Sequence, residues 1–294
     1  MNLLITGGTG FIGSALCSRL LEKQHTIVIL SRHPEIIKAP IHGISELAQL
    51  KDNVIFDVVI NLAGEPIADK RWSVQQKQHI LSSRIDTTQD LIAFFNNIKH
   101  KPKLLISGSA IGYYGVGDTS EFIDETVSGD DSFSSQVCLQ WETVALQAQK
   151  LGIRTCLLRT GIVLGKGGAL RKMLPVFKMG LGGRIGQGKQ WMSWIHLDDL
   201  VGIILHCIEH HSLQGAINGT SPNPVTNQLF TKALGKALNR PTLLPMPAII
   251  IKILMGQMGE ELLLTGKKII PAKALNAGYK FQYEKLEDAL LDVV

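Results

Sequence analysis

Short apolar segments alternate with longer amphipathic segments along much of the chain. Segments rich in Val, Ile and Leu predict strands at 3–6, 26–30, 57–62, 103–107 and 153–159. Helical spacing of the apolar positions predicts helices over 11–23, 75–97 and 134–150. Strands that are apolar on both faces are typical of a buried parallel sheet. The strict alternation of strand and helix therefore predicts a doubly wound α/β fold of the Rossmann type.

The pattern changes after residue 165. Eight glycines fall within 165–188, an apolar helix is expected from Asp198 to about residue 210, and a last core strand at 216–219. Beyond residue 221, prolines punctuate short helical segments. We therefore predict a Rossmann domain over 1–220 and a small, mainly helical C-terminal lobe over 221–294, on the substrate side.

The composition is that of a globular protein, with 45% hydrophobic and 19% charged residues. The four cysteines lack C-x-x-C spacing, which argues against a disulfide framework and against a metal site. The N-terminal residues do not resemble a signal peptide, so a cytoplasmic protein is expected. The apolar segment 248–255 is too short to span a bilayer, and we expect a packed helix there and no membrane partner.

The formal net charge of +5 raises the question of nucleic-acid binding. The densest basic run, at 99–103, is not interleaved with aromatic residues, so no nucleic-acid partner is expected. The basic excess either forms a solvated surface or steers an anionic cofactor or substrate towards the protein.

A glycine-rich turn follows the first predicted strand and opens the first predicted helix. Glycine permits a tight turn, close approach of the backbone to a phosphate, and close packing of helix on strand. The N–H groups at the start of the helix would then face a dinucleotide pyrophosphate. The strand–turn–helix context is the one that this motif requires. The expected cofactor contacts are Gly7, Thr9, Gly10, Phe11, Ile12 and Gly13.

The end of the second strand distinguishes NADP(H) from NAD(H). An NAD site usually has an acidic residue there, which binds the ribose 2′-hydroxyl. This chain has Ser31 and Arg32 instead, with no acid before Glu35. A hydroxyl and a planar guanidinium suit a 2′-phosphate, whereas a carboxylate would repel it. We therefore expect NADP(H), the alternative being that Arg32 is an ordinary exposed charge.

Several longer motifs are similar to those of a known family. The segment TGGTGFIG at 6–13 resembles the extended short-chain dehydrogenase/reductase superfamily, which includes nucleotide-sugar epimerases and dehydratases. More specific matches are NLAGE at 61–65, SSR at 82–84, RTGIVLG at 159–165, GQGKQWMSWIHLDD at 186–199 and EELLL at 260–264. Together they resemble the YfcH-type epimerase family, an atypical short-chain dehydrogenase group, along essentially the whole chain.

The resemblance implies an NADP(H) site assembled from distant segments. The implied contacts are Ser31, Arg32, Leu62, Ala63, Gly64, Arg84 and Val163. For Leu62, Ala63 and Val163 the residues themselves agree, since ligands bind at the carboxyl ends of strands in doubly wound sheets. For Arg84 the alternative is a surface charge, and its assignment depends on the resemblance alone.

Active members of the superfamily use a Tyr-x-x-x-Lys pair on a helix, and this pair is missing. Cys138 and Glu142 stand where it belongs. A carboxylate one turn away raises the pKa of a thiol, so Cys138 is a poor substitute acid or base. The remaining catalytic candidates are Ser109, Tyr113 and Tyr114, which follow a predicted central strand. The alternative is that the tyrosines only pack the loop.

Two functions are therefore open. The first is an NADP(H)-dependent oxidoreductase or epimerase acting on a small polar, sugar-like substrate. The second is a non-catalytic NADP(H)-binding protein that reports the cofactor level or redox state to a partner, which the missing pair would favour. A homodimer through the helices at 75–97 and 134–150 is expected by analogy with the superfamily.

Overall fold

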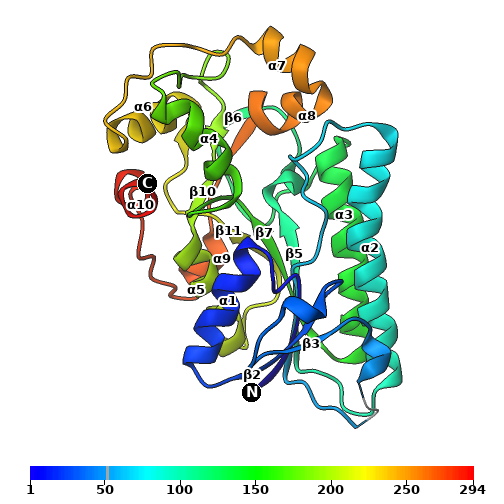
Figure 1. The fold of residues 1–294 in the computed structure, drawn as a ribbon. Coiled ribbons are helices and arrows are strands. Elements are labelled where there is room, and N and C mark those ends of the chain that lie inside the picture. Colours follow the sequence, from blue (N-terminus) through cyan, green and yellow to red (C-terminus); the bar gives the residue numbers. More distant parts are fainter. Residues whose placement is uncertain (51–52) are drawn as a thin grey trace.

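The computed structural model describes residues 1–50 and 53–294 (Figure 1). At its centre is a seven-stranded parallel sheet with strand order β11-β7-β5-β4-β1-β2-β3. The strands are β1 Asn2–Thr6, β2 Thr26–Leu30, β3 His42–Ile44, β4 Val58–Asn61, β5 Leu104–Ala110, β7 Arg154–Thr160 and β11 Gly215–Gly219. Because the chain winds outward from β1 in both directions, the predicted doubly wound Rossmann sheet is confirmed.

Helices cover both faces of the sheet (Figure 1). They are α1 Phe11–Glu22 and α5 Leu197–Glu209 on one face, and α2 Val74–Asn97 and α3 Phe133–Ala145 on the other. Leu16 of α1 and Ile204 of α5 belong to the core on the first face. Phe95 of α2 and Ala145 of α3 belong to the core on the second face. This burial on both sides explains why the strands lack a polar face.

A second lobe lies beyond the carboxyl end of the sheet, at the top of Figure 1. Its core joins Leu170 of α4, Trp194 of β10, Phe230 of α6 and Leu290 of α10. The glycine-rich segment after β8 therefore packs with the lobe that the sequence predicted at 221–294. The remaining helices are α4 Gly168–Lys178, α6 Asn227–Ala237, α7 Ala248–Met255, α8 Gln257–Gly259, α9 Ala272–Asn276 and α10 Leu286–Val293.

Short strand pairs tie the lobe to the Rossmann domain. The pairs are β8 Ile162–Leu164 with β10 Trp194–His196, β9 Trp191–Met192 with β12 Val225–Thr226, and β6 Asp118–Ile123 with β13 Gly266–Ile269. Short 3-10 helices are η1 Pro34–Ile36, η2 Leu47–Gln49, η3 Ile111–Tyr114 and η4 Leu146–Leu151, and η5 Glu260–Leu264 is a π-helix. Among the described residues, no helix combines the length and the apolar character needed to cross a membrane.

Candidate functional site

The glycine turn between β1 and α1 is held against the end of β4. Gly7 has a φ of +70°, and a Cβ atom built on it would lie 2.7 Å from the carbonyl carbon of Leu62 and 2.8 Å from the nitrogen of Ala63. A Cβ on Gly13 would lie 2.2 Å from the carbonyl oxygen of Gly7. Both positions require glycine, because the backbone would otherwise have to move. Thr9 is exposed on the turn.

The N-terminus of α1 is open to an anion. Its N-cap residue, Gly10, offers no side-chain acceptor, and the first main-chain hydrogen bond of the helix runs from the Ser14 N–H to the Gly10 carbonyl. The N–H groups of Phe11, Ile12 and Gly13 therefore have no acceptor within 1–50 and 53–294. Free N–H groups at the positive end of a helix dipole are a typical site for a phosphate.

The glycine-rich segment after β8 closes over the start of α1. A Cβ on Gly167 would lie 2.6 Å from the Phe11 ring. Ile12, Leu62 and Val163 are half-buried and pack against the same core. The structure thus brings together cofactor contacts that were predicted from three distant segments.

A buried chain of hydrogen bonds fixes the backbone at the ends of β1 and β4. The Thr6 hydroxyl donates to Asn61 Oδ1 (2.6 Å) and accepts from the N–H of Ala63 (3.2 Å). Asn61 Nδ2 and Trp141 Nε1 both donate to the Thr88 hydroxyl, at 2.9 and 3.0 Å. These bonds join two strands to α2 and α3 and make the floor of the site rigid. This network could not be predicted from the sequence, because its members are far apart in the chain.

Arg84 of α2 lies flat against Gly64. A Cβ on Gly64 would lie 2.9 Å from Arg84 Cζ, which is 5.2 Å from the Trp141 ring centre. Arg84 Nη1 donates to the carbonyl of Ile80 (2.9 Å), and the guanidinium has no acidic partner in the described part of the chain. Burial lowers the pKa of Arg84, although nearby Cys138 and Glu65 act to raise it. A half-buried guanidinium with unused donors supports the interpretation of Arg84 as a ligand contact.

Ser31 and Arg32 lie at the end of β2, next to the glycine turn in the sheet. Thr6, the last residue of β1, pairs with Leu30. The Ser31 hydroxyl accepts from the N–H of His33 (3.1 Å), and Arg32 is exposed. The first acid downstream, Glu35, contacts the His33 ring. The arrangement leaves the Arg32 guanidinium available to a phosphate group.

The helix position of the missing lysine holds a buried ion pair. Glu142 Oε1 and Oε2 accept from Arg159 Nε and Nη2, at 2.9 and 2.8 Å, and each side chain is 5% exposed. The Ser109 hydroxyl donates to Glu142 Oε1 (2.6 Å). The Ser109 hydroxyl is therefore occupied by a hydrogen bond to a buried, ion-paired carboxylate. This contact argues against the predicted role of Ser109 in catalysis. The sheet register, in which Ser109 pairs with Arg159, brings the three groups together.

The two tyrosines of η3 surround the same arginine. The Tyr114 hydroxyl accepts from Arg159 Nη1 (3.0 Å) and donates to Asn218 Oδ1 (2.7 Å), and the side chain is fully buried. Burial raises the pKa of Tyr114 to about 12, against the opposing effect of Arg159. These contacts argue against Tyr114 as a proton donor. Tyr113 is half-buried, with Arg159 Cζ 3.3 Å from its ring centre, and its catalytic role stays a prediction.

Cys138, at the position of the usual tyrosine, is buried beside Ala110, whose carbonyl lies 3.6 Å from the thiol. Burial raises the pKa of Cys138 to about 11, and Glu142 adds to this effect, as the sequence predicted. We expect the folded protein to react with iodoacetamide at Cys138 about a hundredfold more slowly at pH 8 than a thiol of ordinary pKa. Mass spectrometry of the alkylated protein, with a sample alkylated in urea as the control, would measure this; rapid native labelling would contradict it.

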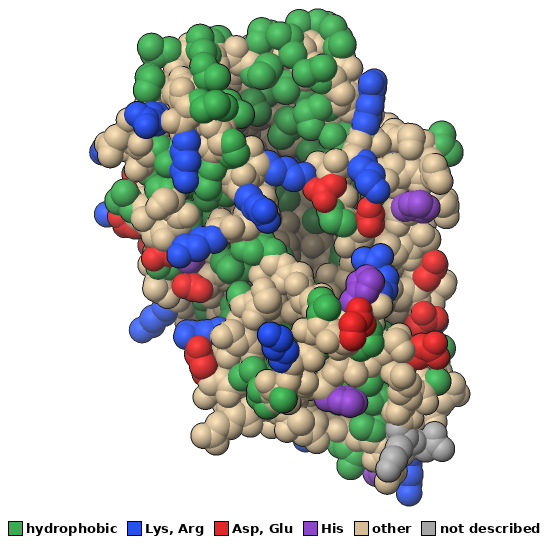
Figure 2. Space-filling model, in the orientation of Figure 1, with side chains coloured by type: hydrophobic (Ala, Val, Ile, Leu, Met, Phe, Trp, Pro, Cys, Tyr) green, Lys and Arg blue, Asp and Glu red, His purple; other side chains and the backbone are tan. Residues whose placement is uncertain are grey.

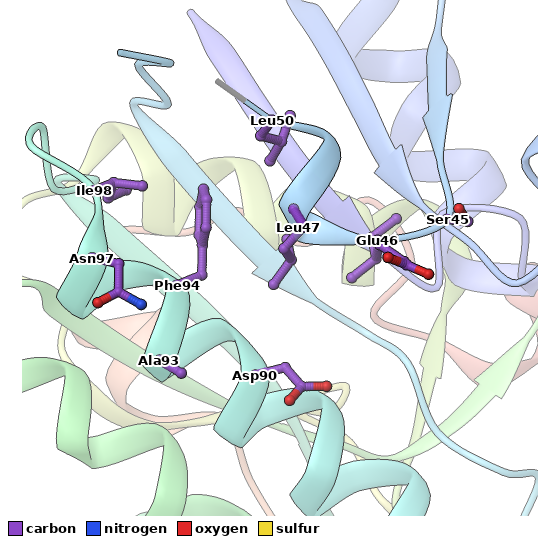
Figure 3. A pocket seen from close by; sticks show the side chains of 11 residues that line it. Ser45, Glu46, Leu47, Leu50, Asp90, Ala93, Phe94, Asn97 and Ile98 are labelled. Atoms are coloured by element: carbon purple, nitrogen blue, oxygen red, sulfur yellow. The ribbon is translucent and has the colours of Figure 1, made fainter. Parts of the chain in front are cut away.

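Another groove on the Rossmann domain lies away from the glycine turn (Figure 3). It has a volume of about 600 Å³ and lies between η2 and α2. Leu47 and Phe94 reach into it from its two walls. Neither the glycine turn nor Arg84 lines this groove, so we assign it no part in cofactor binding.

The chain matches two family models. The NAD dependent epimerase/dehydratase family matches residues 3–218, and a domain of unknown function, DUF1731, matches residues 246–293. The chain is 42% identical to the chloroplastic epimerase family protein SDR39U1 homolog of Arabidopsis thaliana, covering 99% of this chain and 86% of that protein. It is 37% identical to the epimerase family protein YfhF of Bacillus subtilis, covering 100% and 98%.

Solved structures support the same family assignment. Human epimerase family protein SDR39U1, crystallised with NADPH, superposes with a TM-score of 0.90 at 33% identity and covers 100% of this chain and 99% of its own. UDP-glucuronic acid 4-epimerase of Bacillus cereus, in complex with NAD, shares only the fold, with a TM-score of 0.78 at 19% identity, covering 100% and 95%. The resemblance found in the sequence is confirmed: the chain belongs to the NAD dependent epimerase/dehydratase family.

Proposed function

We propose that the chain binds NADP(H) across the carboxyl end of its sheet and uses it in an oxidoreductase or epimerase reaction. The observation that carries the proposal is the cradle formed by Gly7, Gly13 and the open N-terminus of α1. Arg32, at the end of β2, favours NADP(H) over NAD(H). The NADPH in the structure of the human relative supports the same choice.

The residues present fit this cofactor. The N–H groups of α1 would bind the pyrophosphate, and Arg32 with Ser31 would bind the 2′-phosphate. Arg84, stacked on Gly64, would hold a carbonyl or phosphate oxygen with its unused donors. When bound, the nicotinamide would supply or accept a hydride. The buried bonds beneath Ala63 would keep this floor in place during the reaction.

The substrate would bind in the hollow between the lobe and the Rossmann domain, which Figure 2 shows near the centre of the molecule. Charged side chains connect the lobe to the Rossmann domain. Lys172 of α4 contacts Asp69, and a Cβ on Gly256 would lie 3.1 Å from the Arg71 guanidinium. Exposed Arg71 and half-buried Glu65 suit hydroxyl or carboxylate groups, which supports a small polar substrate.

Replacing Arg32 with alanine should weaken NADPH binding by roughly 10- to 100-fold and leave NADH binding unchanged, because only NADPH carries the 2′-phosphate. Isothermal titration calorimetry with NADPH, NADP⁺ and NADH would measure this. Lys38→Ala, which removes another cation from the same region, is the matched control. Equal losses for NADPH and NADH, or no preference in the unaltered protein, would contradict the assignment.

A second function, NADP(H) sensing without catalysis, is favoured by the commitment of Ser109, Tyr114 and Cys138 to buried contacts. Catalysis then needs another proton donor, and Tyr113 is the candidate that remains. Oxidation of NADPH, followed as the loss of the reduced nicotinamide's absorbance at about 340 nm, separates the two functions when it is measured over a panel of aldehydes, ketones and sugar derivatives. Turnover that is lost in Tyr113→Phe supports the enzyme. Tight NADPH binding without turnover of any compound supports the sensor.

A further inference from the structure

Helix α7 exposes an apolar stripe. Its sequence, AIIIKILM at 248–255, was expected to form a packed helix, but only Ile251 is buried. Ile249, Ile253 and Leu254 are 62%, 65% and 65% exposed, and Ile250 is 39% exposed. Ile249 and Ile253, like Ile250 and Leu254, are four positions apart, and residues at spacings of three and four lie on the same side of a helix. This side of α7 therefore has no covering element within the chain that the structure describes.

Neighbouring segments extend the stripe into a surface. Leu181, Leu243, Leu244 and Met246 are all exposed. The two segments that carry them lie side by side, because Met246 exchanges main-chain hydrogen bonds with the 184–186 segment. Figure 2 shows hydrophobic side chains gathered at the top of the molecule, where Figure 1 places α7. We call α7 together with residues 181 and 243–246 the apolar tip. Apolar surfaces of this kind on soluble folds are typically interaction sites.

The two sequence segments that carry most of the apolar tip and the lobe around it contain basic but no acidic residues. No Asp or Glu occurs within 166–197 or within 221–259. The charged residues of these two segments are Lys166, Arg171, Lys172, Lys178, Arg184, Lys189, Lys232, Lys236, Arg240 and Lys252. Arg240 Nε donates to the carbonyl of Lys178 (2.9 Å), which places two of these cations beside each other next to Pro241 and Gly180. Lys252, on α7 itself, pairs with Glu260 at 2.9 Å.

We propose that the apolar tip docks on the surface of an anionic lipid bilayer, with α7 lying in the plane of the interface. Apolar side chains surrounded by Lys and Arg are the chemistry by which a short helix binds such a surface without crossing it. A second copy of the chain fits less well, because a two-fold contact would place like charges opposite each other. No membrane partner was expected from the sequence because α7 is too short to span a bilayer, but a helix that lies on the bilayer surface does not need that length.

Flotation with unilamellar vesicles tests the proposal. We expect the full chain to float with vesicles of phosphatidylcholine and phosphatidylglycerol and not with phosphatidylcholine alone, and added salt should reduce the bound fraction. Ile253→Ser combined with Leu254→Ser should lower the partition coefficient about tenfold or more. Both side chains are exposed, so the variant should keep the fold, which circular dichroism and NADPH binding would verify.

Matched variants make the test specific. Leu291→Ser removes an apolar side chain of α10 that is 64% exposed but lies outside the apolar tip, and it should bind vesicles like the unaltered chain. Lys178→Gln with Arg240→Gln should weaken binding, whereas Lys99→Gln on the Rossmann domain should not. No flotation, equal flotation with neutral vesicles, or equal losses for Leu291→Ser would overturn the proposal. So would gel filtration showing a dimer that the Ile253 and Leu254 replacements convert to a monomer.

Discussion

Replacing Arg159 with methionine is expected to lower the free energy of unfolding by about 3–5 kcal/mol. The change leaves the Glu142 carboxylate buried without its two hydrogen bonds from the guanidinium, at 2.9 and 2.8 Å. Ser109 alone, donating to the same carboxylate, cannot compensate for a full charge. Urea unfolding, followed by circular dichroism and tryptophan fluorescence, would measure the loss.

Two further variants show whether the charge or the packing is responsible. Combining Arg159→Met with Glu142→Leu removes both charges, and it should be less destabilising than Arg159→Met alone. Lys23→Met breaks the ion pair between Lys23 and Glu209, two side chains that are about half exposed. It should change the free energy of unfolding by less than about 1 kcal/mol. If Arg159→Met were as mild as Lys23→Met, the pair would not be holding β7 to α3.

This ion pair also gives a physical reason for the missing lysine. Glu142, at the helix position of the missing lysine, turns towards Arg159 at the end of β7. Arg159 in turn supports Tyr114, whose hydroxyl bonds Asn218 at the end of β11. Glu142 at this helix position therefore helps to hold η3 against the end of the sheet. Any catalysis by this chain must use a different proton donor from that of the superfamily.

The Rossmann sheet could be predicted because its signals are local. A buried parallel strand is apolar on both faces, and β1, β2, β4, β5 and β7 each carry that pattern. The lobe could not be delimited in the same way. Its core residues come from distant parts of the chain, with Leu170 and Leu290 more than a hundred positions apart. Only tertiary packing joins these two residues with Trp194 and Phe230. The three-residue strand β3 and the two-residue strands β9 and β12 leave too short a pattern to recognise.

In the candidate site, too, the residues with a local sequence signal could be predicted and those placed by tertiary packing could not. The glycines at 7, 10 and 13 could be predicted because the motif is continuous, and the structure requires glycine at Gly7, which has a positive φ, and at Gly13, where a Cβ would meet the Gly7 carbonyl. The partner of Arg159 could not, since Glu142 comes from another element and only the fold places it there. A buried arginine at the end of a central strand requires an acidic partner. The sequence signal that could have identified this partner is Glu142, the acidic residue of α3. For Ser109 and Tyr114 the sequence gives position but not orientation, and orientation decides whether a hydroxyl faces a ligand or the core.

Gly13→Ala is expected to weaken NADPH binding by about a hundredfold, which corresponds to about 2.7 kcal/mol. The added Cβ would lie 2.2 Å from the Gly7 carbonyl oxygen and 2.7 Å from Gly8 Cα, and backbone atoms cannot yield as a flexible side chain would. The turn must therefore open, which displaces the N–H groups that we propose to bind the pyrophosphate. Ser14→Ala, at the next and exposed position of α1, is the matched control and should titrate like the unaltered chain in calorimetry. Unaltered NADPH affinity in a folded Gly13→Ala variant would show that the cofactor binds elsewhere.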